Sequence, residues 1–255
     1  MEQGPGTNPE PFFYKDRRWG VRVVSGKGRL FFHVDCPYDG IDERFDDILD
    51  WEVIGNRYSP LFLFGDYSGV PTSWLDKPVF KQSCPPSNPN AIAFFHPVVI
   101  EREPKPITEC EHLTGFQGSL KTHSCRKNIY RICDNMRVAE WWSEDNDSLR
   151  MSYIEHLDNT KFVLCPRGRG LNSIRFFEAL RMGRIPVLIS DDTKLPMEDR
   201  IDYSRFMVRM PENDISYEYI HYWICSHDLA DASKEARKVS LEWFDDSEKF
   251  IKELE

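Results

Sequence analysis

The sequence lacks any run of about 20 apolar residues, the length that an α-helix needs to cross a bilayer. Its first residues, MEQGPGTNPEP, are polar and contain no apolar core of the kind found in signal peptides. From these two absences we expect no membrane span and a cytoplasmic location.

The chain also lacks an excess of positive charge. It carries 33 Lys and Arg against 42 Asp and Glu, a formal net charge of −9. Because proteins bind nucleic acids mainly through phosphates, this balance disfavours a nucleic-acid partner, although a local basic pocket stays compatible with it. No GxGxxG turn follows an early strand, which argues against a nucleotide-binding enzyme of another class, such as an epimerase.

Cysteine is present without the pattern of a small disulfide scaffold. The seven cysteines are an odd number and are scattered, so we expect reduced thiols, with one or two disulfides left open. Zinc is the alternative for a mixed group of thiols and imidazoles: Cys110, His112, His123, Cys125 and Cys133. Their Cys-x-His and His-x-Cys pairs are tighter than the usual spacers of zinc sites, and we expect no metal there.

The chain is long enough for one large domain or two small ones. Its 255 residues are 40% hydrophobic and 13% aromatic, as in a folded globular protein. We predict a flexible tail over residues 1–11 and an N-terminal lobe over 12–105. The prolines and charges at 101–106 then lead into a C-terminal lobe over 106–255.

Short apolar runs predict the elements of both lobes. Strands are expected at 20–24, 29–34, 61–64, 91–100 and 115–120, and helices at 42–54, 126–136, 148–157, 217–224 and 232–254. The fold class is therefore α/β.

The most informative segment is 161–192, KFVLCPRGRGLNSIRFFEALRMGRIPVLISDD. An apolar strand at 162–164 is followed by a basic glycine turn, a helix with apolar residues at 3.6-residue spacing, and a β-branched strand at 185–189. Asn172 or Ser173 is the N-cap, and Gly183 is the stop. This is a βαβ unit of the kind that binds phosphates.

The chemistry that this unit suits is recognition of a diphosphate. The helix N-terminus offers amides, Gly168 permits close approach, and Arg167 and Arg169 can donate charge-assisted hydrogen bonds. Glu178, farther along the helix, can accept from ribose hydroxyls, and Asp191 follows the second strand at the ligand-binding edge. The alternative is that both arginines are solvated and that Glu178 pairs with a neighbouring arginine.

The run CPRGRGLNSIRFFEALRMGRIPVLIS, followed by DDTKLPMEDRIDYSRFMVRMPEND, resembles the donor-binding half of exostosin-like glycosyltransferases, glycosyltransferase family 47. Upstream, GFQGSLKTHSCRKNIYRICD is similar to the preceding strand, turn and helix of that family. The compact form without an anchor resembles the members encoded by large DNA viruses of algae.

The resemblance implies a GT-B-like fold of two Rossmann-like lobes, with the donor site in the C-terminal lobe and a reduced N-terminal lobe. It implies an inverting transfer of a monosaccharide from a UDP-sugar, UDP-xylose being one candidate, to a hydroxyl of a glycan acceptor. No cofactor or metal is implied for the transfer, and the sequence lacks the Asp-x-Asp of metal-dependent sugar transferases. Arg126 matches an arginine whose expected role is a phosphate contact.

An inverting transfer also needs a base that removes the proton of the acceptor hydroxyl. We expect it from the N-terminal lobe, with Asp66, just after the strand at 61–64, as first candidate and Asp35 as second. An aspartate after a strand is also a common turn former, which is the alternative for Asp66. If no base is present, the chain is instead an inactive partner subunit that binds nucleotide sugars.

Overall fold

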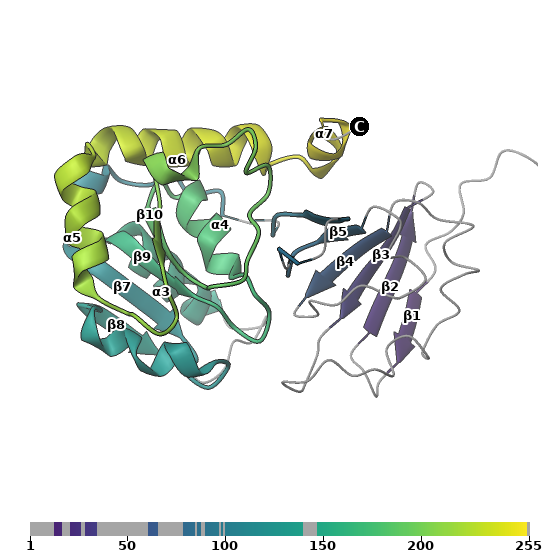
Figure 1. Cartoon of the computed structure of the whole chain (residues 1–255), viewed down its shortest axis with the longest axis horizontal. Helices are drawn as coiled ribbons and strands as arrows, with labels where there is room; N and C mark the ends of the chain where they lie inside the picture. Colours follow the sequence, from purple (N-terminus) through teal and green to yellow (C-terminus); the bar gives the residue numbers. More distant parts are fainter. Residues whose placement is uncertain are drawn as a thin grey trace, which may run out of the picture. The chain divides into compact units, whose positions relative to one another are not determined.

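The computed structural model describes residues 13–16, 21–26, 29–34, 61–65 and 79–253, apart from 85, 88, 89, 97, 99 and 140–146. The chain divides into two compact units. The first contains residues 1–94, 169–171 and 192–196, and the second contains the rest (Figure 1). The tail at 1–11 and the helix at 42–54 lie outside the described residues, and the predicted lobe bounds stay predictions.

The first unit contains a six-stranded sheet in the order β1-β2-β3-β4-β5-β6. Its strands are β1 (Phe13–Asp16), β2 (Val21–Gly26), β3 (Arg29–Val34), β4 (Leu61–Gly65), β5 (Val79–Lys81) and β6 (Ala91–Ala93). The pairs β1-β2 and β2-β3 are antiparallel, and β3 to β6 run parallel. The strands predicted at 20–24, 29–34 and 61–64 are confirmed, whereas β1 and β5 were not predicted.

The strand predicted over 91–100 is wrong beyond Ala93. Phe95 belongs to the second unit, where its ring lies 5.5 Å from that of Phe244 and 5.3 Å from that of Phe250. Burial of this aromatic ring therefore takes the chain out of the first sheet.

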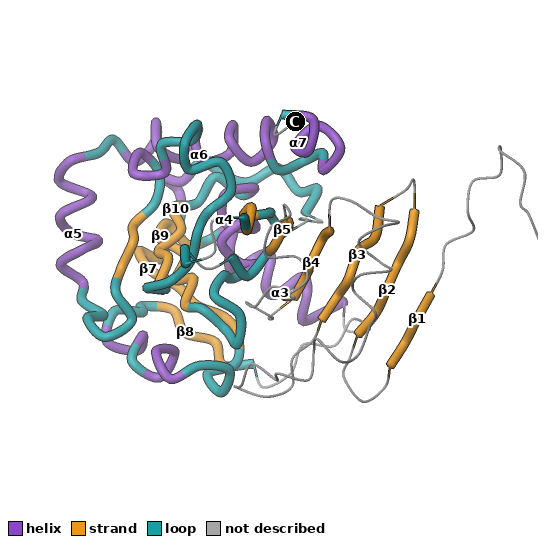
Figure 2. Tube along the Cα trace, turned by 45° about the vertical axis from the view of Figure 1, so that its right-hand side comes forward, coloured by secondary structure: helices purple, strands orange, loops and turns teal. Residues whose placement is uncertain are grey.

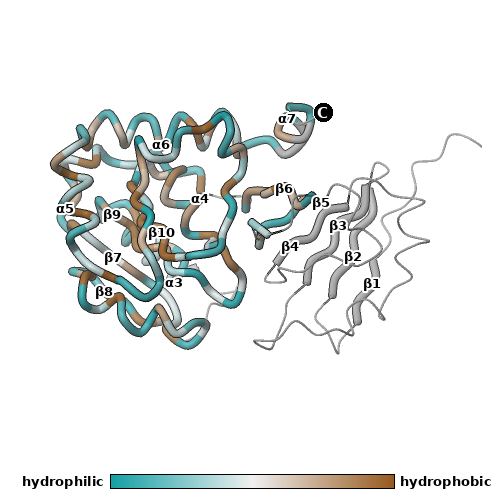
Figure 3. Tube along the Cα trace, in the orientation of Figure 1, coloured by the Kyte–Doolittle hydropathy of each residue, from teal (hydrophilic) through white to brown (hydrophobic). Residues whose placement is uncertain are grey.

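The second unit is built on a five-stranded parallel sheet in the order β11-β10-β9-β7-β8 (Figures 1 and 2). Its strands are β7 (His112–Gly118), β8 (Asn135–Val138), β9 (Thr160–Pro166), β10 (Ile185–Ile189) and β11 (Val208–Met210). Every residue of β10 is buried, and the hydrophobic colour of Figure 3 follows β9 and β10. The predicted α/β class with a parallel sheet is confirmed for this unit.

Two helices cover one face of this sheet. α3 (Asp147–Asp158) lies against β7 and β9, and α4 (Ile174–Arg181) lies against β9 and β10. The Tyr153 hydroxyl of α3 donates to Glu178 of α4, which places both helices on the same side. β9, α4 and β10 confirm the predicted βαβ unit, with Ser173 as N-cap and Gly183 at φ +60° as the stop.

The C-terminal segment forms three helices, α5 (Tyr217–Ser226), α6 (Leu229–Trp243) and α7 (Ser247–Lys252). The single helix predicted over 232–254 is wrong, because α6 ends before Phe244. Phe244 is 2% exposed and packs edge-on against Phe177 of α4 at 5.4 Å. The backbone N–H of Lys249 donates to the Asp246 carboxylate at the start of α7, which suits a new helix beginning there.

The helix predicted over 126–136 is also wrong. The chain makes two 3₁₀ turns, η3 (Ser124–Lys127) and η4 (Ile129–Arg131), and then enters β8. Thr114 of β7 fixes this change, because its N–H donates to Asp134 Oδ2 at 3.2 Å and its hydroxyl oxygen accepts from the Asp134 N–H at 2.9 Å. The pairing of β8 with β7 thus prevails over the apolar spacing that predicted a helix here.

A buried arginine that the sequence analysis missed ties the start of this unit to its sheet. Arg184 is 1% exposed, and its guanidinium donates to Asp158 Oδ1 at 2.8 Å and to the carbonyl oxygens of Lys105 and Leu157. Satisfied on several sides, this charge is held at a fixed position in the interior.

β7 comes close to the end of α3 and the start of β9 at Gly115. A Cβ at Gly115 would lie 2.6 Å from Thr160 Oγ1 and 2.9 Å from His156 Nε2. His156 is 1% exposed, and neither of its ring nitrogens has a hydrogen-bond partner among the described residues. Burial, with the positive charges of Arg137 and Arg175 and the nearby His112, lowers the pKa of His156 to about 4.

We expect His156 to make this protein sensitive to acid. With a pKa of 6.5 when unfolded and about 4 when folded, the unfolded state binds the extra proton between these values. The free energy of unfolding therefore falls as the pH drops through this window, by up to about 1.4 kcal/mol per pH unit. Denaturant titrations at several pH values give the free energy of unfolding as a function of pH. This free energy should depend less steeply on pH in His156→Asn than in the wild type, while exposed His221→Asn keeps the wild-type dependence. The same pH dependence of the unfolding free energy in all three proteins would contradict the prediction.

Candidate functional site

The strand order of the second unit defines where a ligand can enter. The chain moves from β7 outward to β8 and then crosses back to β9 on the other side of β7. In parallel sheets of this order, ligands bind at the carboxyl ends of the strands at such a switch point. Here the two segments that follow β7 and β9 are residues 119–123, the β7 loop, and residues 167–173, the β9 loop.

Arg126 joins these two loops. Its guanidinium donates from Nε to the Arg167 carbonyl at 2.8 Å, from one terminal nitrogen to Ser119 O at 2.8 Å, and from the other to Pro166 O at 3.2 Å. The residue is 9% exposed. A Cβ at Gly168 would lie 3.3 Å from its Nη2, so a small residue suits this approach. The phosphate contact predicted for Arg126 stays a prediction beside this observed positioning role.

Arg175 supports the same edge from the first turn of α4. Its guanidinium lies 4.5 Å from the centre of the Phe116 ring and donates to the Gln117 carbonyl. A Cβ at Gly118 would come within 2.7 Å of its Nη2. The glycine at the end of β7 is therefore needed to make room for this arginine, whose supporting role was not predicted from the sequence.

Several polar atoms at the switch point are buried without a partner. Asn172 is 8% exposed and its Oδ1 accepts from the Ser173 N–H at 2.7 Å, but its Nδ2 has no hydrogen-bond partner among the described residues. The same holds for Gln117 Oε1 at the end of β7 and for Thr122 Oγ1 in the β7 loop. Because an unpaired buried polar atom costs about 1–3 kcal/mol, these atoms favour a polar ligand at this edge.

The remaining predicted donor residues lie on both units. Arg169 falls in the first unit with Leu171, whose N–H donates to Ser83 Oγ at 2.9 Å. Glu178 is half-buried and accepts from Tyr153 OH at 2.5 Å. Burial raises the pKa of Glu178, and the Tyr153 hydrogen bond and the charge of Arg175 oppose that rise.

Asp191 and Glu212 form a reciprocal pair across the ends of β10 and β11. The Asp191 N–H donates to Glu212 Oε1 at 3.2 Å, and the Glu212 N–H donates to Asp191 Oδ1 at 2.9 Å. Glu212 Oε1 is also 3.7 Å from an Nη1 of Arg167. Glu212 was not predicted from the sequence, although an acid just beyond an apolar strand is the same signal that identified Asp191.

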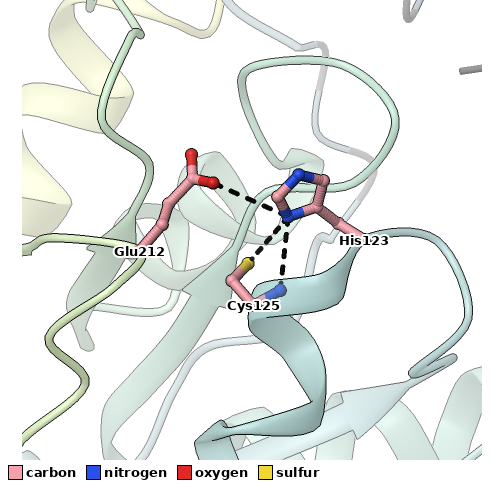
Figure 4. A group of neighbouring side chains, drawn as sticks. All are labelled: His123, Cys125 and Glu212. Carbon is pink, nitrogen blue, oxygen red and sulfur yellow. Dashed lines mark hydrogen bonds and ion pairs between the residues drawn. The ribbon is translucent and has the colours of Figure 1, made fainter.

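His123 and Cys125 lie next to Glu212. His123 Nδ1 lies 3.2 Å from Cys125 Sγ and 3.7 Å from Glu212 Oε2 (Figure 4). Burial, with the Glu212 charge, raises the pKa of the Cys125 thiol to about 11. Among the described residues, Cys110, His112 and Cys133 do not join this group. Cys110 instead lies against the Asp158 carbonyl, with Sγ at 3.3 Å.

Both candidate bases, Asp66 and Asp35, lie outside the described residues and stay predictions.

Comparison with known proteins identifies the family. Residues 82–222 match the exostosin GT47 domain, and the match covers more than half of the chain. The chain belongs to the exostosin GT47 glycosyltransferase family. The family resemblance found in the sequence is therefore confirmed, and the exostosin domain contains every predicted donor residue as well as His123, Cys125 and Glu212.

Exostosin-1 proteins of animals are among the relatives. The chain is 46% identical to the exostosin-1 homolog of Caenorhabditis elegans over 105 residues, which are 40% of this chain and 26% of that protein. It is 49% identical to exostosin-1 of Drosophila melanogaster over 97 residues, 37% of this chain and 12% of that protein. The matched part thus spans about a quarter or less of the length of these exostosins.

Among the helices of the described residues, none combines the length and the apolar character that a bilayer span requires.

We expect Arg126→Lys to destabilise the exostosin domain by about 1–3 kcal/mol, because one ammonium cannot reproduce the three-way guanidinium contact and buried carbonyls lose their donor. Chemical denaturation measures the loss. The control is Arg205→Lys, an exposed arginine paired with Glu235 at 3.1 Å, for which a change below about 0.5 kcal/mol is expected. Equal losses of stability in both variants would show that the three hydrogen bonds of Arg126 do not stabilise the domain more than an exposed ion pair does.

Proposed function

We propose that this chain is an inverting glycosyltransferase that moves a monosaccharide from a UDP-sugar, UDP-xylose being one candidate, to a hydroxyl of a glycan acceptor. The observation that carries the proposal is a set of buried polar atoms at the switch point of a parallel sheet, which have no hydrogen-bond partner among the described residues. They lie next to loops held by Arg126. Membership of the GT47 family supports the reaction class.

The diphosphate of the donor is the group that this edge suits best. The side chain of Arg167 is 17% exposed and can turn from Glu212 to a phosphate oxygen. The N-terminus of α4 adds backbone amides and a partial positive charge, and Asn172 Nδ2 adds a neutral donor. Together these donors stabilise the negative charge that develops on UDP as it leaves.

The ribose of the donor is assigned to Glu178. Tyr153 holds one carboxylate oxygen of Glu178 and so fixes the orientation of the side chain. The other oxygen then accepts from the vicinal ribose hydroxyls, as acidic residues do in related nucleotide folds.

The transfer itself follows the inverting pattern that the family resemblance implies, in a GT-B arrangement of two lobes. A carboxylate from the N-terminal lobe, Asp66 or else Asp35, takes the proton of the acceptor hydroxyl. That oxygen attacks the anomeric carbon while the bond to UDP breaks on the opposite face. No metal ion is required for this step, since arginine and amide donors carry the charge of the leaving group.

Nucleotide binding is the first test. A thermal-shift panel of UDP-xylose, UDP-glucose, UDP-galactose, UDP-glucuronate, GDP-mannose, UDP and GDP should show stabilisation by the uridine compounds, with one sugar preferred. Arg167→Ala should weaken UDP binding about tenfold or more, because a charge-assisted hydrogen bond contributes about 1.5–3 kcal/mol. Arg205→Ala is the matched control, and its affinity for UDP should equal that of the wild type.

Absence of any uridine-dependent stabilisation at millimolar ligand would overturn the donor-site assignment. Equal loss of binding in both arginine variants would remove Arg167 from it.

Turnover is the second test. Slow hydrolysis of the preferred UDP-sugar without acceptor should fall on the order of a hundredfold in Asp66→Asn, while UDP still binds. A rate within about threefold of wild type would exclude Asp66 as the base and move the test to Asp35→Asn. Binding without turnover in the wild-type protein would instead identify an inactive partner subunit.

A further inference from the structure

We propose, against the expectation from the tight His-x-Cys spacing, that His123 and Cys125 bind a zinc ion together with Glu212, which the spacing does not include. His123 caps η3, Cys125 lies within it, and Glu212 lies two residues beyond β11, so the three come from segments almost 90 residues apart. Figure 4 shows the three side chains turned toward one another. One ligand atom of each lies within 4.8 Å of the other two.

The geometry favours a shared ion over a proton relay. A nucleophile–base–acid relay uses the two different nitrogens of the imidazole, one for each neighbour. Here Cys125 Sγ at 3.2 Å and Glu212 Oε2 at 3.7 Å both face Nδ1 of His123. With both neighbours on the same nitrogen, the three donor atoms form one compact group, as the ligands of a single metal ion do.

The separations also fit the size of the ion. Zinc binds thiolate at about 2.3 Å and imidazole or carboxylate at about 2.1 Å, which puts tetrahedral ligand atoms about 3.4–3.6 Å apart. The separations from His123 Nδ1 to Cys125 Sγ and to Glu212 Oε2, 3.2 and 3.7 Å, lie on either side of this range. The third separation, between Sγ and Oε2, is within 4.8 Å. Binding therefore needs only small side-chain rotations, together with loss of the long 3.4 Å hydrogen bond from the Cys125 N–H to Nδ1.

Neighbouring groups already orient the carboxylate. Glu212 Oε1 accepts from the Asp191 N–H and faces Arg167, which turns Oε2 toward His123. Such outer contacts are typical of metal ligands and raise the affinity of the site. A thiolate and an imidazole select zinc over magnesium or manganese.

On binding, the Cys125 thiol releases its proton to solvent and a sulfur–zinc bond forms. Three protein ligands leave one position of a tetrahedral ion for water. The ion would link η3 to the end of β11, on either side of Arg167. Its role is to position these segments, and the proposal does not depend on the glycosyltransferase assignment.

Direct metal binding tests the site in the full chain. The purified protein is stripped with a chelator and titrated with Zn²⁺ in competition with a chromophoric chelator, and with Co²⁺ to detect thiolate-to-cobalt charge transfer. One tight equivalent is expected. Cys125→Ser and Glu212→Gln should each weaken zinc binding by at least about tenfold, and Cys125→Ser should also abolish the charge-transfer absorption.

The chain supplies a matched control in Cys225, whose Sγ lies 3.9 Å from His221 Nε2 on the exposed face of α5. In the described part of the chain, Cys225 belongs to no group of three possible metal ligands. Cys225→Ser should leave the tight equivalent unchanged. Circular dichroism verifies that each variant is folded, and Glu212→Gln keeps the test decisive if Cys125→Ser does not fold. Wild-type affinity in both cluster variants, or loss of the tight equivalent in Cys225→Ser, would overturn the proposal.

Discussion

The guanidinium of Arg126 is the contact on which the candidate site depends. The carboxyl end of a parallel sheet exposes backbone carbonyls that have no further strand to pair with, and buried carbonyls need donors. Arg126 supplies three of these contacts at once, to Ser119, Pro166 and Arg167. A planar fork with five donors can do this, whereas an ammonium on a flexible stem cannot. The loops on both sides of the switch point are thereby held in one arrangement.

A second arginine, Arg175, supports the same edge of the sheet. The guanidinium groups of Arg175 and Arg126 both lie over the Phe116 ring. Arg175 also donates to the Gln117 carbonyl, near the end of β7. Two guanidinium groups and one aromatic ring thus lie together near the carboxyl end of β7. Arg175 acts on the charge of Glu178, and the charges of Arg126, Arg167, Asp191 and Glu212 all act on the Cys125 thiol. This part of an acidic protein thus carries both cations and carboxylates. A local group of cations of this kind can accept an anion without a basic surface elsewhere.

Most of the second unit could be predicted from local patterns. The apolar run at 162–164, the 3.6-residue spacing of the helix and Gly183 identified β9, α4 and its end, because burial of one helix face and the positive φ of glycine are local requirements. The same reasoning failed at 126–136. There the hydrogen bonds between Thr114 and Asp134 draw the chain into β8, and helical spacing contains no information about a partner strand 20 residues upstream.

By itself, the sequence determined the family, the α/β class and the segment that carries the predicted donor residues, since each of these is written in contiguous runs of residues. The tertiary structure alone decided which side chains meet. Glu212 joins His123 and Arg167 only because β11 and β9 end at the same edge of one parallel sheet. The task of Arg126 likewise depends on carbonyls 40 and 41 residues away. Such contacts follow from strand order, and no local periodicity encodes them.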